Sequence, residues 1–168
     1  MSIKVGGKMF LQKIKVKVKK LENFKGELPR YQTPGSSGFD VRAQLLEPLV
    51  LQPSQRALVP TGLSFEIPVG YEIQARPRSG LAAKAGLSLL NTPGTIDADY
   101  RGEVKIILIN LGQEAMTLND QERIAQLVIC PVVVGEFEWV SELEASERGT
   151  GGFGSTGGAA AIKNGHPV

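Results

Sequence analysis

The sequence predicts an all-β domain, an antiparallel sandwich or barrel with one short helix. Two observations support this fold class. Short β-rich runs recur along the chain, and Pro/Gly signals such as Pro68-Val-Gly70 and Pro93-Gly94 separate them at the spacing of antiparallel strands. The length of 168 residues and the apolar content of 42% also fit a single domain with one core of ordinary size.

The predicted strands combine β-branched and apolar residues between turn signals. They are residues 10–18, 39–45, 55–67, 71–75, 87–90, 103–111, 122–134 and 136–140. In the first of these runs, lysines alternate with apolar residues, which indicates a strand with one solvated side and lysines protecting its edge.

The only predicted helix begins near Ser79 and continues to Ala85. Ser79 is expected to cap its first turn, and Gly86 is expected to end it. The first N–H groups of this helix would then face outward, toward an anion.

The strand pattern stops after residue 140. We therefore predict four parts of the chain: a peripheral extension at 1–8, a β-barrel domain at 9–140, a glycine-rich arm at 141–157, and a disordered tail at 158–168.

Composition excludes several classes of protein. The net charge of +2 is too small to support nucleic-acid binding by bulk electrostatics, so we expect the lysine-rich N-terminus to be a solvated face. The single Cys130 lies in an apolar run, which predicts a buried thiol, no disulfide within the chain and a reducing compartment. No apolar stretch approaches about 18 residues and no secretory leader is evident, so we expect a soluble, cytoplasmic protein.

A glycine-rich run from Arg148 to Gly157 contains Phe153, Ser155 and Thr156. Glycines let backbone N–H groups turn toward an anion, an arginine supplies a charged fork, and a phenylalanine offers a stacking face. These residues suit a triphosphate bound beside a flat base. On composition alone, a solvated linker is the commoner interpretation of such a tail.

Two further clusters carry matching chemistry. In Pro77-Arg78-Ser79-Gly80, a guanidinium, a hydroxyl and a helix N-terminus would form a phosphate seat, although an ordinary capped turn has the same composition. The loop from Asn91 to Gly102 places an amide, acids and an aromatic together. A carboxylate there can polarise water, whereas the alternative is that Asp97 and Asp99 merely solvate a turn.

Together these segments resemble the five ordered motifs of the trimeric dUTP pyrophosphatases, and the resemblance extends over residues 10–157. The motif sequences are Ser37-Gly38-Phe39-Asp40, Pro77-Arg78-Ser79-Gly80-Leu81-Ala82, Gly94-Thr95-Ile96-Asp97-Ala98-Asp99-Tyr100-Arg101-Gly102, Glu122-Arg123-Ile124-Ala125-Gln126-Leu127 and Arg148 to Gly157.

The resemblance implies a jelly-roll-like fold, a homotrimer with shared active sites, and Mg²⁺-dependent hydrolysis of dUTP to dUMP and pyrophosphate. This reaction limits uracil in DNA and supplies the thymidylate precursor. Asp97 matches the carboxylate that activates water for attack on the α-phosphorus. Tyr100 matches the ring that packs against the deoxyribose and rejects UTP. The uracil would be bound by Asn91 and by hairpin positions including Gly94, Thr95, Ile96 and Lys105.

The same resemblance implies which residues bind the phosphates and the metal. Arg78, Ser79 and Gly80 match the α/β-phosphate seat, and Gln126 matches a polar residue that supports the phosphates or the water. Asp40 resembles a water-mediated contact to Mg²⁺, which is otherwise held by the substrate phosphates. The arm would close over the site, as a lid formed by Arg148, Phe153, Gly154, Ser155 and Thr156.

The chain departs from the family pattern at one position, and two alternative functions stand beside this interpretation. Gln121 stands where the fourth motif usually has glycine, which costs roughly 1 kcal/mol if the position requires a positive φ. The first alternative is a deoxycytidine triphosphate deaminase. That family has its catalytic glutamate at the position of Ile107, so the general acid/base for deamination is absent from this chain. A non-catalytic binding relative should have lost residues such as Asp97 and Tyr100, both of which are present.

Overall fold

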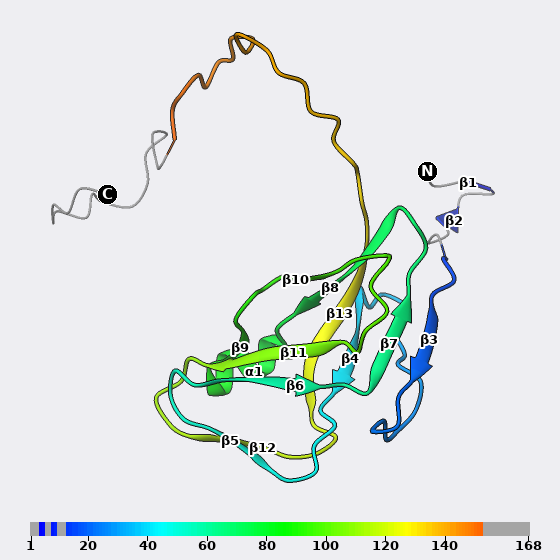
Figure 1. Cartoon of the computed structure of the whole chain (residues 1–168), viewed down its shortest axis with the longest axis vertical. Coiled ribbons are helices and arrows are strands. Elements are labelled where there is room, and N and C mark those ends of the chain that lie inside the picture. Colours follow the sequence, from blue (N-terminus) through cyan, green and yellow to red (C-terminus); the bar gives the residue numbers. More distant parts are fainter. Residues whose placement is uncertain (1–3, 6–7, 10–12, 153–168) are drawn as a thin grey trace, which may run out of the picture. The chain divides into compact units, whose positions relative to one another are not determined.

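The computed structural model describes residues 4–5, 8–9 and 13–152 (Figure 1). The chain divides into two compact units, residues 1–133 and 134–168. All strand pairings in the described part of the chain are antiparallel, and its one helix has seven residues. The predicted all-β class is therefore confirmed.

The elements follow one another within the first unit. They are β1 Lys4–Val5, β2 Lys8–Met9, β3 Lys17–Lys20, β4 Gly38–Arg42, β5 Leu49–Leu51, β6 Arg56–Pro60, β7 Leu63–Glu66, β8 Tyr71–Arg76, α1 Ser79–Ala85, β9 Leu87–Leu89, β10 Gly94–Ile96, β11 Lys105–Asn110, β12 Met116–Leu118 and β13 Arg123–Pro131. The larger sheets have the orders β10-β8-β13-β4 and β6-β11-β9, and the remaining strands form the pairs β1-β2, β12-β5 and β3-β7.

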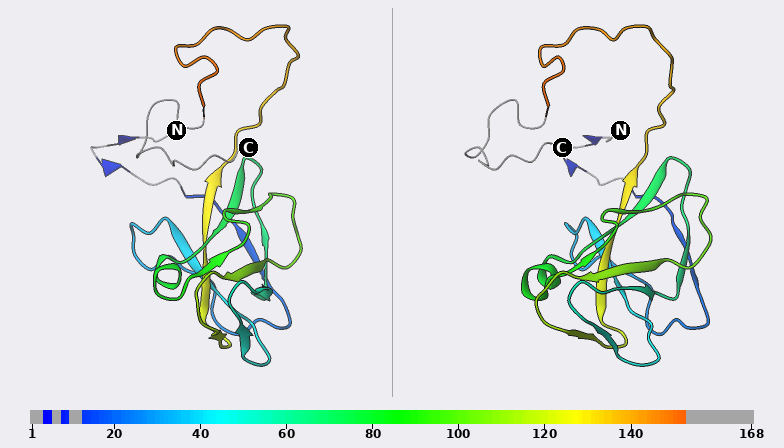
Figure 2. Two further views of the ribbon diagram at one scale, coloured as in Figure 1. Left: turned by 90° about the vertical axis from the view of Figure 1, so that its left-hand side faces the viewer. Right: turned by 60° about the vertical axis from the view of Figure 1, so that its left-hand side comes forward.

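The nine-residue strand β13 organises the four-stranded sheet, because it pairs with β4 on one side and with β8 on the other (Figure 2). Leu127 of β13 is fully buried in register with Phe39 and Ala75. The second sheet contributes Ile106 and Leu108 to the same hydrophobic cluster. Burial of such side chains, at about 25 cal/mol per Å² of apolar surface, is the main force that holds the strands together.

Several predicted strands have different bounds in the structure. The N-terminal lysine-rich strand is Lys17–Lys20 rather than residues 10–18; no strand is formed over 13–16, and 10–12 lie outside the described residues. The run 55–67 is two strands, β6 and β7. The chain turns between them at Gly62, where φ is +67° and a Cβ would stand 2.8 Å from the Phe24 backbone.

The prediction of a strand at residues 136–140 is wrong for the isolated chain. This segment has no strand partner, and the side chains of Phe137 and Trp139 are almost completely exposed. The apolar alternation is real, but no part of the described chain pairs with it.

The N-cap of the helix is one residue earlier than predicted. Arg78, not Ser79, is the N-cap residue; its carbonyl accepts from the N–H groups of Leu81 and Ala82, and no side chain caps the turn. Gly86 ends the helix at φ 66°, as predicted, and a Cβ there would stand 2.5 Å from the Gly112 nitrogen.

Two further findings concern membrane-spanning helices and the single cysteine. In the part of the chain that the structure describes, no helix is long and apolar enough to cross a membrane. Cys130 is half-buried rather than fully buried, and its Sγ lies 3.9 Å from an Arg76 nitrogen.

Candidate active site

The hairpin joining β10 to β11 lines a cavity of about 390 Å³ in the first unit. Five of the predicted site residues meet there: Thr95, Ile96, Asp97, Tyr100 and Lys105. The other lining residues are Leu58, Glu103, Val104 and Ile107. The cavity therefore combines one strand end, a turn and the outer faces of β6 and β11.

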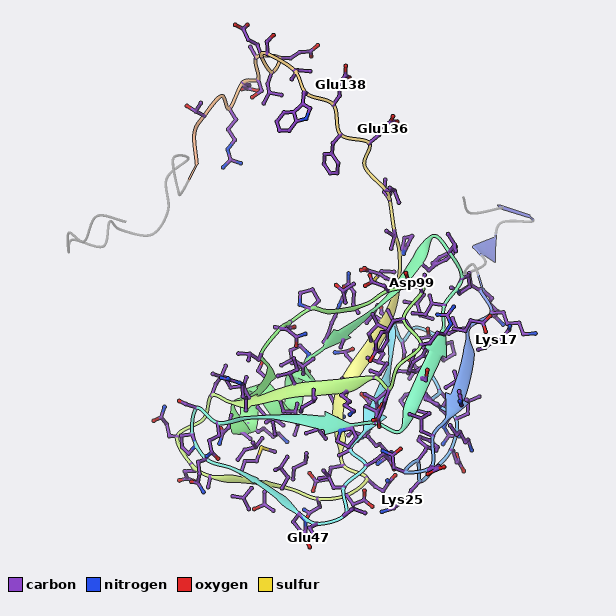
Figure 3. All side chains as sticks on the ribbon, in the orientation of Figure 1. Lys17, Lys25, Glu47, Asp99, Glu136 and Glu138 are labelled. Carbon is purple, nitrogen blue, oxygen red and sulfur yellow. The ribbon has the colours of Figure 1, made fainter. Side chains whose placement is uncertain are left out.

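Asp97 directly follows β10, so the strand fixes the start of its backbone while the carboxylate stays exposed. The chain then turns back, because the Tyr100 N–H donates to the Asp97 carbonyl at 3.2 Å. Figure 3 shows Asp99 in this hairpin, as a second exposed acid of the same turn. Asp97 differs from Asp99 in that it lines the cavity.

The ring of Tyr100 lies folded over its own turn. Its hydroxyl donates to the Glu103 carbonyl at 3.0 Å, and its side chain remains 46% exposed. Gly102 makes this position possible, since a Cβ there would overlap the phenolic oxygen and stand 2.6 Å from the ring carbon that bears it. The hairpin therefore presents one ring face in a fixed place.

Glu103 lines the cavity but was not among the residues predicted for the site. Its carboxylate accepts from the Gly62 N–H at 2.8 Å and from Asn23 Nδ2 at 3.0 Å. Its other oxygen forms an ion pair with Lys105 Nζ at 3.5 Å. The Lys105 ammonium is thus held at the cavity wall.

A second group of residues surrounds the carboxylate of Asp40 on β4; Asp40 and Arg78 are predicted site residues, whereas Arg123 was not predicted to have a role there. Arg78 Nε lies 3.1 Å from Oδ1, and Arg123 Nη1 lies 3.1 Å from Oδ2. The Asp40 and Arg78 side chains are 19% and 25% exposed. A register shift in β13 between Arg123 and Ala125 accompanies this placement, as β-bulges do when they redirect a side chain.

Gln126 joins this arginine cluster through the sheet register. It is paired with Asp40 on β4 and with Arg76 on β8, and its Nε2 donates to the Pro77 carbonyl at 3.1 Å. Gln126 therefore braces the backbone just before Arg78.

Ser79 and Gly80 form the exposed first turn of α1, directly after Arg78. A Cβ at Gly80 would meet nothing within 4 Å. Packing within this chain therefore does not require glycine at this position, which leaves room for close approach by another molecule.

The hairpin residues and the arginine cluster lie at opposite ends of β8. Ile96, just before Asp97, is paired with Ile73 near the start of β8, whereas Arg78 follows its end. Extended chain from residue 73 to residue 78 covers roughly 16 Å. Asn91 and Gly94 lie toward the Arg78 end, since Gly94 is paired with Ala75, and they do not line the hairpin cavity.

Gln121 has a φ of 63°, so the position does adopt the left-handed conformation considered above. The side chain compensates in part: Nε2 donates to Oε1 of the buried Gln44 at 2.9 Å. Next to it, bonds from Lys25, the Leu45 N–H and Gln121 lower the pKa of Asp120 to about 2. Lys25 belongs to the loop after β3 (Figure 3).

The remaining predicted residues belong to the second unit. Arg148 is exposed, and its Nε donates to the Gly151 carbonyl at 2.7 Å. Phe153, Gly154, Ser155 and Thr156 lie outside the described residues. Across residues 4–5, 8–9 and 13–152, no group of three His, Cys, Asp or Glu side chains is placed to hold a metal ion.

Comparison with known proteins identifies the family. Residues 25–157 match the family described as dUTPase. The deoxyuridine 5'-triphosphate nucleotidohydrolase of Bdellovibrio bacteriovorus is 72% identical over 149 residues, which cover 89% of this chain and 100% of that protein. The enzyme of the same name from Fusobacterium nucleatum is 54% identical over 147 residues, covering 88% and 99%.

Solved structures agree with the fold. A mutant dUTPase of Staphylococcus bacteriophage 80alpha with dUpNHpp has a TM-score of 0.76 and 30% identity, over 85% of this chain and 98% of that one. A mutant dUTPase from phage phi11 of S. aureus, described with a structural Mg(II) ion, has a TM-score of 0.69 and 26% identity, over 79% and 100%. The family match over residues 25–157 and the identity to the two bacterial enzymes over nearly their whole length show that the chain belongs to the dUTPase family.

Proposed function

We propose that this chain hydrolyses dUTP to dUMP and pyrophosphate, with Asp97 as the base. The observation that carries the proposal is the cavity in which Asp97 and Tyr100 meet on one hairpin of a dUTPase-family fold. The names of the bacterial relatives describe the same activity, and a related phage enzyme binds dUpNHpp.

Asp97 would act on water. Its carboxylate is exposed at the end of β10 and lines the cavity, so a water molecule can reach it beside a bound nucleotide. The carboxylate accepts a proton from this water as the oxygen attacks the α-phosphorus, and the bond from phosphorus to the bridging oxygen of pyrophosphate breaks.

Tyr100 and the hairpin would select the nucleoside. A ring face fixed beside the sugar leaves no space and no partner for a 2′-hydroxyl, so UTP is disfavoured. Backbone groups around Thr95, Ile96 and Lys105 would pair with uracil, and Asn91, which is exposed, is a further donor and acceptor for the base.

Arg78, Ser79, Gly80 and Gln126 would bind the phosphates. In the free protein Asp40 holds Arg78 in place, and a triphosphate supplies the additional negative charge that the two arginines can share. The donor set fits Mg²⁺ carried by the substrate. Both Asp40 oxygens already accept from guanidinium groups, so a contact through water suits this carboxylate better than direct coordination. The ion would neutralise phosphate charge.

The site would be shared within a homotrimer. A base must approach the reacting phosphorus to a few ångströms, yet Asp97 and Arg78 of one chain lie at opposite ends of β8. Different chains would therefore supply the hairpin and the phosphate seat. The exposed Phe137 and Trp139 support an assembly, since large apolar side chains in a row are typical of interfaces.

The arm would complete each site. Arg148, Phe153, Gly154, Ser155 and Thr156 are proposed to close over the base and the terminal phosphates, excluding other water. We place the enzyme in the cytoplasm, which the free Cys130 supports, and we expect no membrane or nucleic-acid partner.

Ile107 bears on the rival deaminase function. It lines the hairpin cavity, so its position is the right one for a catalytic group, but its side chain is apolar and carries no proton. Release of ammonia from dCTP would be needed to favour that reaction.

The decisive experiment measures pyrophosphate release from dUTP, UTP, dCTP and dTTP with Mg²⁺. We expect release from dUTP alone, a loss of at least about a thousandfold in Asp97→Asn, and nearly unchanged activity in the matched variant Asp99→Asn. An inactive wild-type protein that is folded would refute the proposal. Equal losses in the two variants would refute the assignment of the base.

A further inference from the structure

We infer that Glu103 is a positioning residue that fixes Tyr100, and through it the discrimination between deoxyribose and ribose. This inference rests on the proposed function, because it takes Tyr100 as the ring beside the sugar. Glu103 holds Tyr100 through its backbone carbonyl and is itself bound to the rest of the domain through its side chain.

The link to Tyr100 is made by the backbone of Glu103. Its carbonyl accepts a hydrogen bond from the Tyr100 hydroxyl at 3.0 Å, and this bond sets the orientation of the ring. Any displacement of the Glu103 backbone therefore moves the acceptor that sets the angle of the ring. With Gly102 beneath the ring, no side chain at that position offers an alternative support.

The link to the domain is made by the Glu103 side chain, which is only 16% exposed. One oxygen accepts from the Gly62 N–H at 2.8 Å and from Asn23 Nδ2 at 3.0 Å. The other oxygen lies 3.5 Å from Lys105 Nζ. Bonds to an ionised carboxylate are roughly twice as strong as neutral ones, so this side chain is a strong anchor.

The anchoring partner is itself rigid. Gly62 is buried at φ +67°, and a Cβ at this position would stand 2.8 Å from the Phe24 α-carbon, so no other residue fits there. Its neighbours also bind the hairpin: Thr61 Oγ1 donates to the Val104 carbonyl at 2.6 Å and Ser64 Oγ donates to the Arg101 carbonyl at 2.6 Å. Residues 61–64 thus form a fixed template for residues 101–104.

Glu103 holds a special place in this template. The bonds from Thr61 and Ser64 act on the backbone on either side, and the Val104 N–H, in the same peptide unit as the Glu103 carbonyl, donates to the Leu63 carbonyl at 2.8 Å. The Glu103 carboxylate anchors the other end of this peptide unit, at the residue whose carbonyl holds the ring. Losing the carboxylate leaves the hairpin attached through the backbone bonds but lets the peptide unit, and with it this carbonyl, tilt. The expected defect is therefore in selectivity for the sugar rather than in folding or in the chemical step.

The test compares kcat/KM for dUTP and UTP in the full-length protein. In Glu103→Ala we expect the ratio of the two values to fall about tenfold, the size of one lost hydrogen bond to a charged group. Glu103→Gln keeps an oxygen for Gly62 and Asn23, so its ratio should stay within about threefold of the wild type. If Glu103→Ala does not fold, Glu103→Asp replaces it in the test. This variant withdraws the carboxylate by one methylene, and we expect the ratio of kcat/KM for dUTP to that for UTP to fall by a smaller factor.

The matched control is Glu66→Ala. Glu66 also pairs with a lysine, Lys17, at 2.7 Å, but it lies on β7 and does not line the cavity. We expect an unchanged ratio in this variant. The inference is overturned if Glu103→Ala lowers the dUTP and UTP rates by the same factor, or if Glu66→Ala changes the ratio as much.

Binding of dUMP and UMP by calorimetry separates this inference from the proposed function. If the wild-type protein releases no pyrophosphate but prefers dUMP to UMP, the proposed hydrolysis fails, and the inference is decided by whether Glu103→Ala removes that preference. If the wild-type protein hydrolyses dUTP and the variant keeps its preference for dUMP, only the inference fails.

Discussion

Asp40 Oδ1 lies 3.1 Å from Nε of Arg78, the N-cap residue of α1, and the same carboxylate bridges to Arg123 on the neighbouring strand β13. Asp40→Asn would leave two guanidinium groups facing each other without a shared anion. We expect the free energy of unfolding to fall by about 1–2 kcal/mol, and the Mg²⁺ concentration at half-maximal velocity to rise. Thermal unfolding and metal titrations measure the two effects. Unchanged thermal stability would contradict the bridging role, and an unchanged Mg²⁺ requirement would contradict the contact to the metal.

Gln121 combines a strained backbone with a useful side chain. Replacement by glycine relieves the positive φ, worth roughly 1 kcal/mol, and removes the bond to the buried Gln44, worth about the same. We therefore expect Gln121→Gly to be nearly neutral in urea unfolding. The matched variant Gln121→Ala keeps the strain and loses the bond, so it should be less stable than the glycine variant by about 1 kcal/mol. Equal stability of the two variants would show that the backbone strain is negligible.

Gly102 provides the space that the Tyr100 ring occupies. In Gly102→Ala the new methyl group would overlap the ring, so the ring must leave the Glu103 carbonyl. We expect kcat/KM for dUTP to fall at least about tenfold with little change in thermal stability, because the ring is half exposed. Gly35→Ala is the control, since a Cβ there meets nothing within 4 Å. A fully active Gly102→Ala enzyme would show that the ring position does not matter for the reaction.

Asp120 makes stability depend on pH in the acid range. Lys25 and the Leu45 N–H hold its pKa at about 2 in the folded chain, below the ordinary value of 3.8. A depressed folded-state pKa stabilises the fold above the unfolded-state value, and this contribution is lost as the pH falls from about 4 to about 2. Asp120→Asn should therefore be less stable than the wild type at pH 6, with the difference shrinking toward pH 2 in denaturant titrations. A difference that does not depend on pH would indicate that the carboxylate's charge is unimportant.

Local patterns predicted the elements that depend on local sequence. The helix from Ser79 to Ala85 and the strand near residues 71–76 follow from a compact apolar pattern between turn signals. The three-residue strands β5, β10 and β12 were missed because their identity depends on distant partners; Leu49, for example, is paired with Leu118. Such short runs carry no periodicity of their own.

The residues of the candidate site also divide into those that local sequence can predict and those that depend on distant contacts. The hairpin residues from Thr95 to Tyr100 come together because they are neighbours in sequence, and a motif sufficed to find them. Glu103 was missed because what marks it is a contact to Asn23, 80 residues away, and to Gly62, 41 residues away. The bridge from Asp40 to Arg123 spans 83 residues and likewise exists only in the folded chain.

The placement of Asp97 and Arg78 at opposite ends of β8 has a genetic consequence. If neighbouring chains complete each site as proposed, a chain that carries a defect in both groups impairs one site through its missing base and another through its missing phosphate seat. A single altered copy would then silence more than its own share of an assembly, and such an allele would behave as partly dominant in a cell that also makes the normal protein.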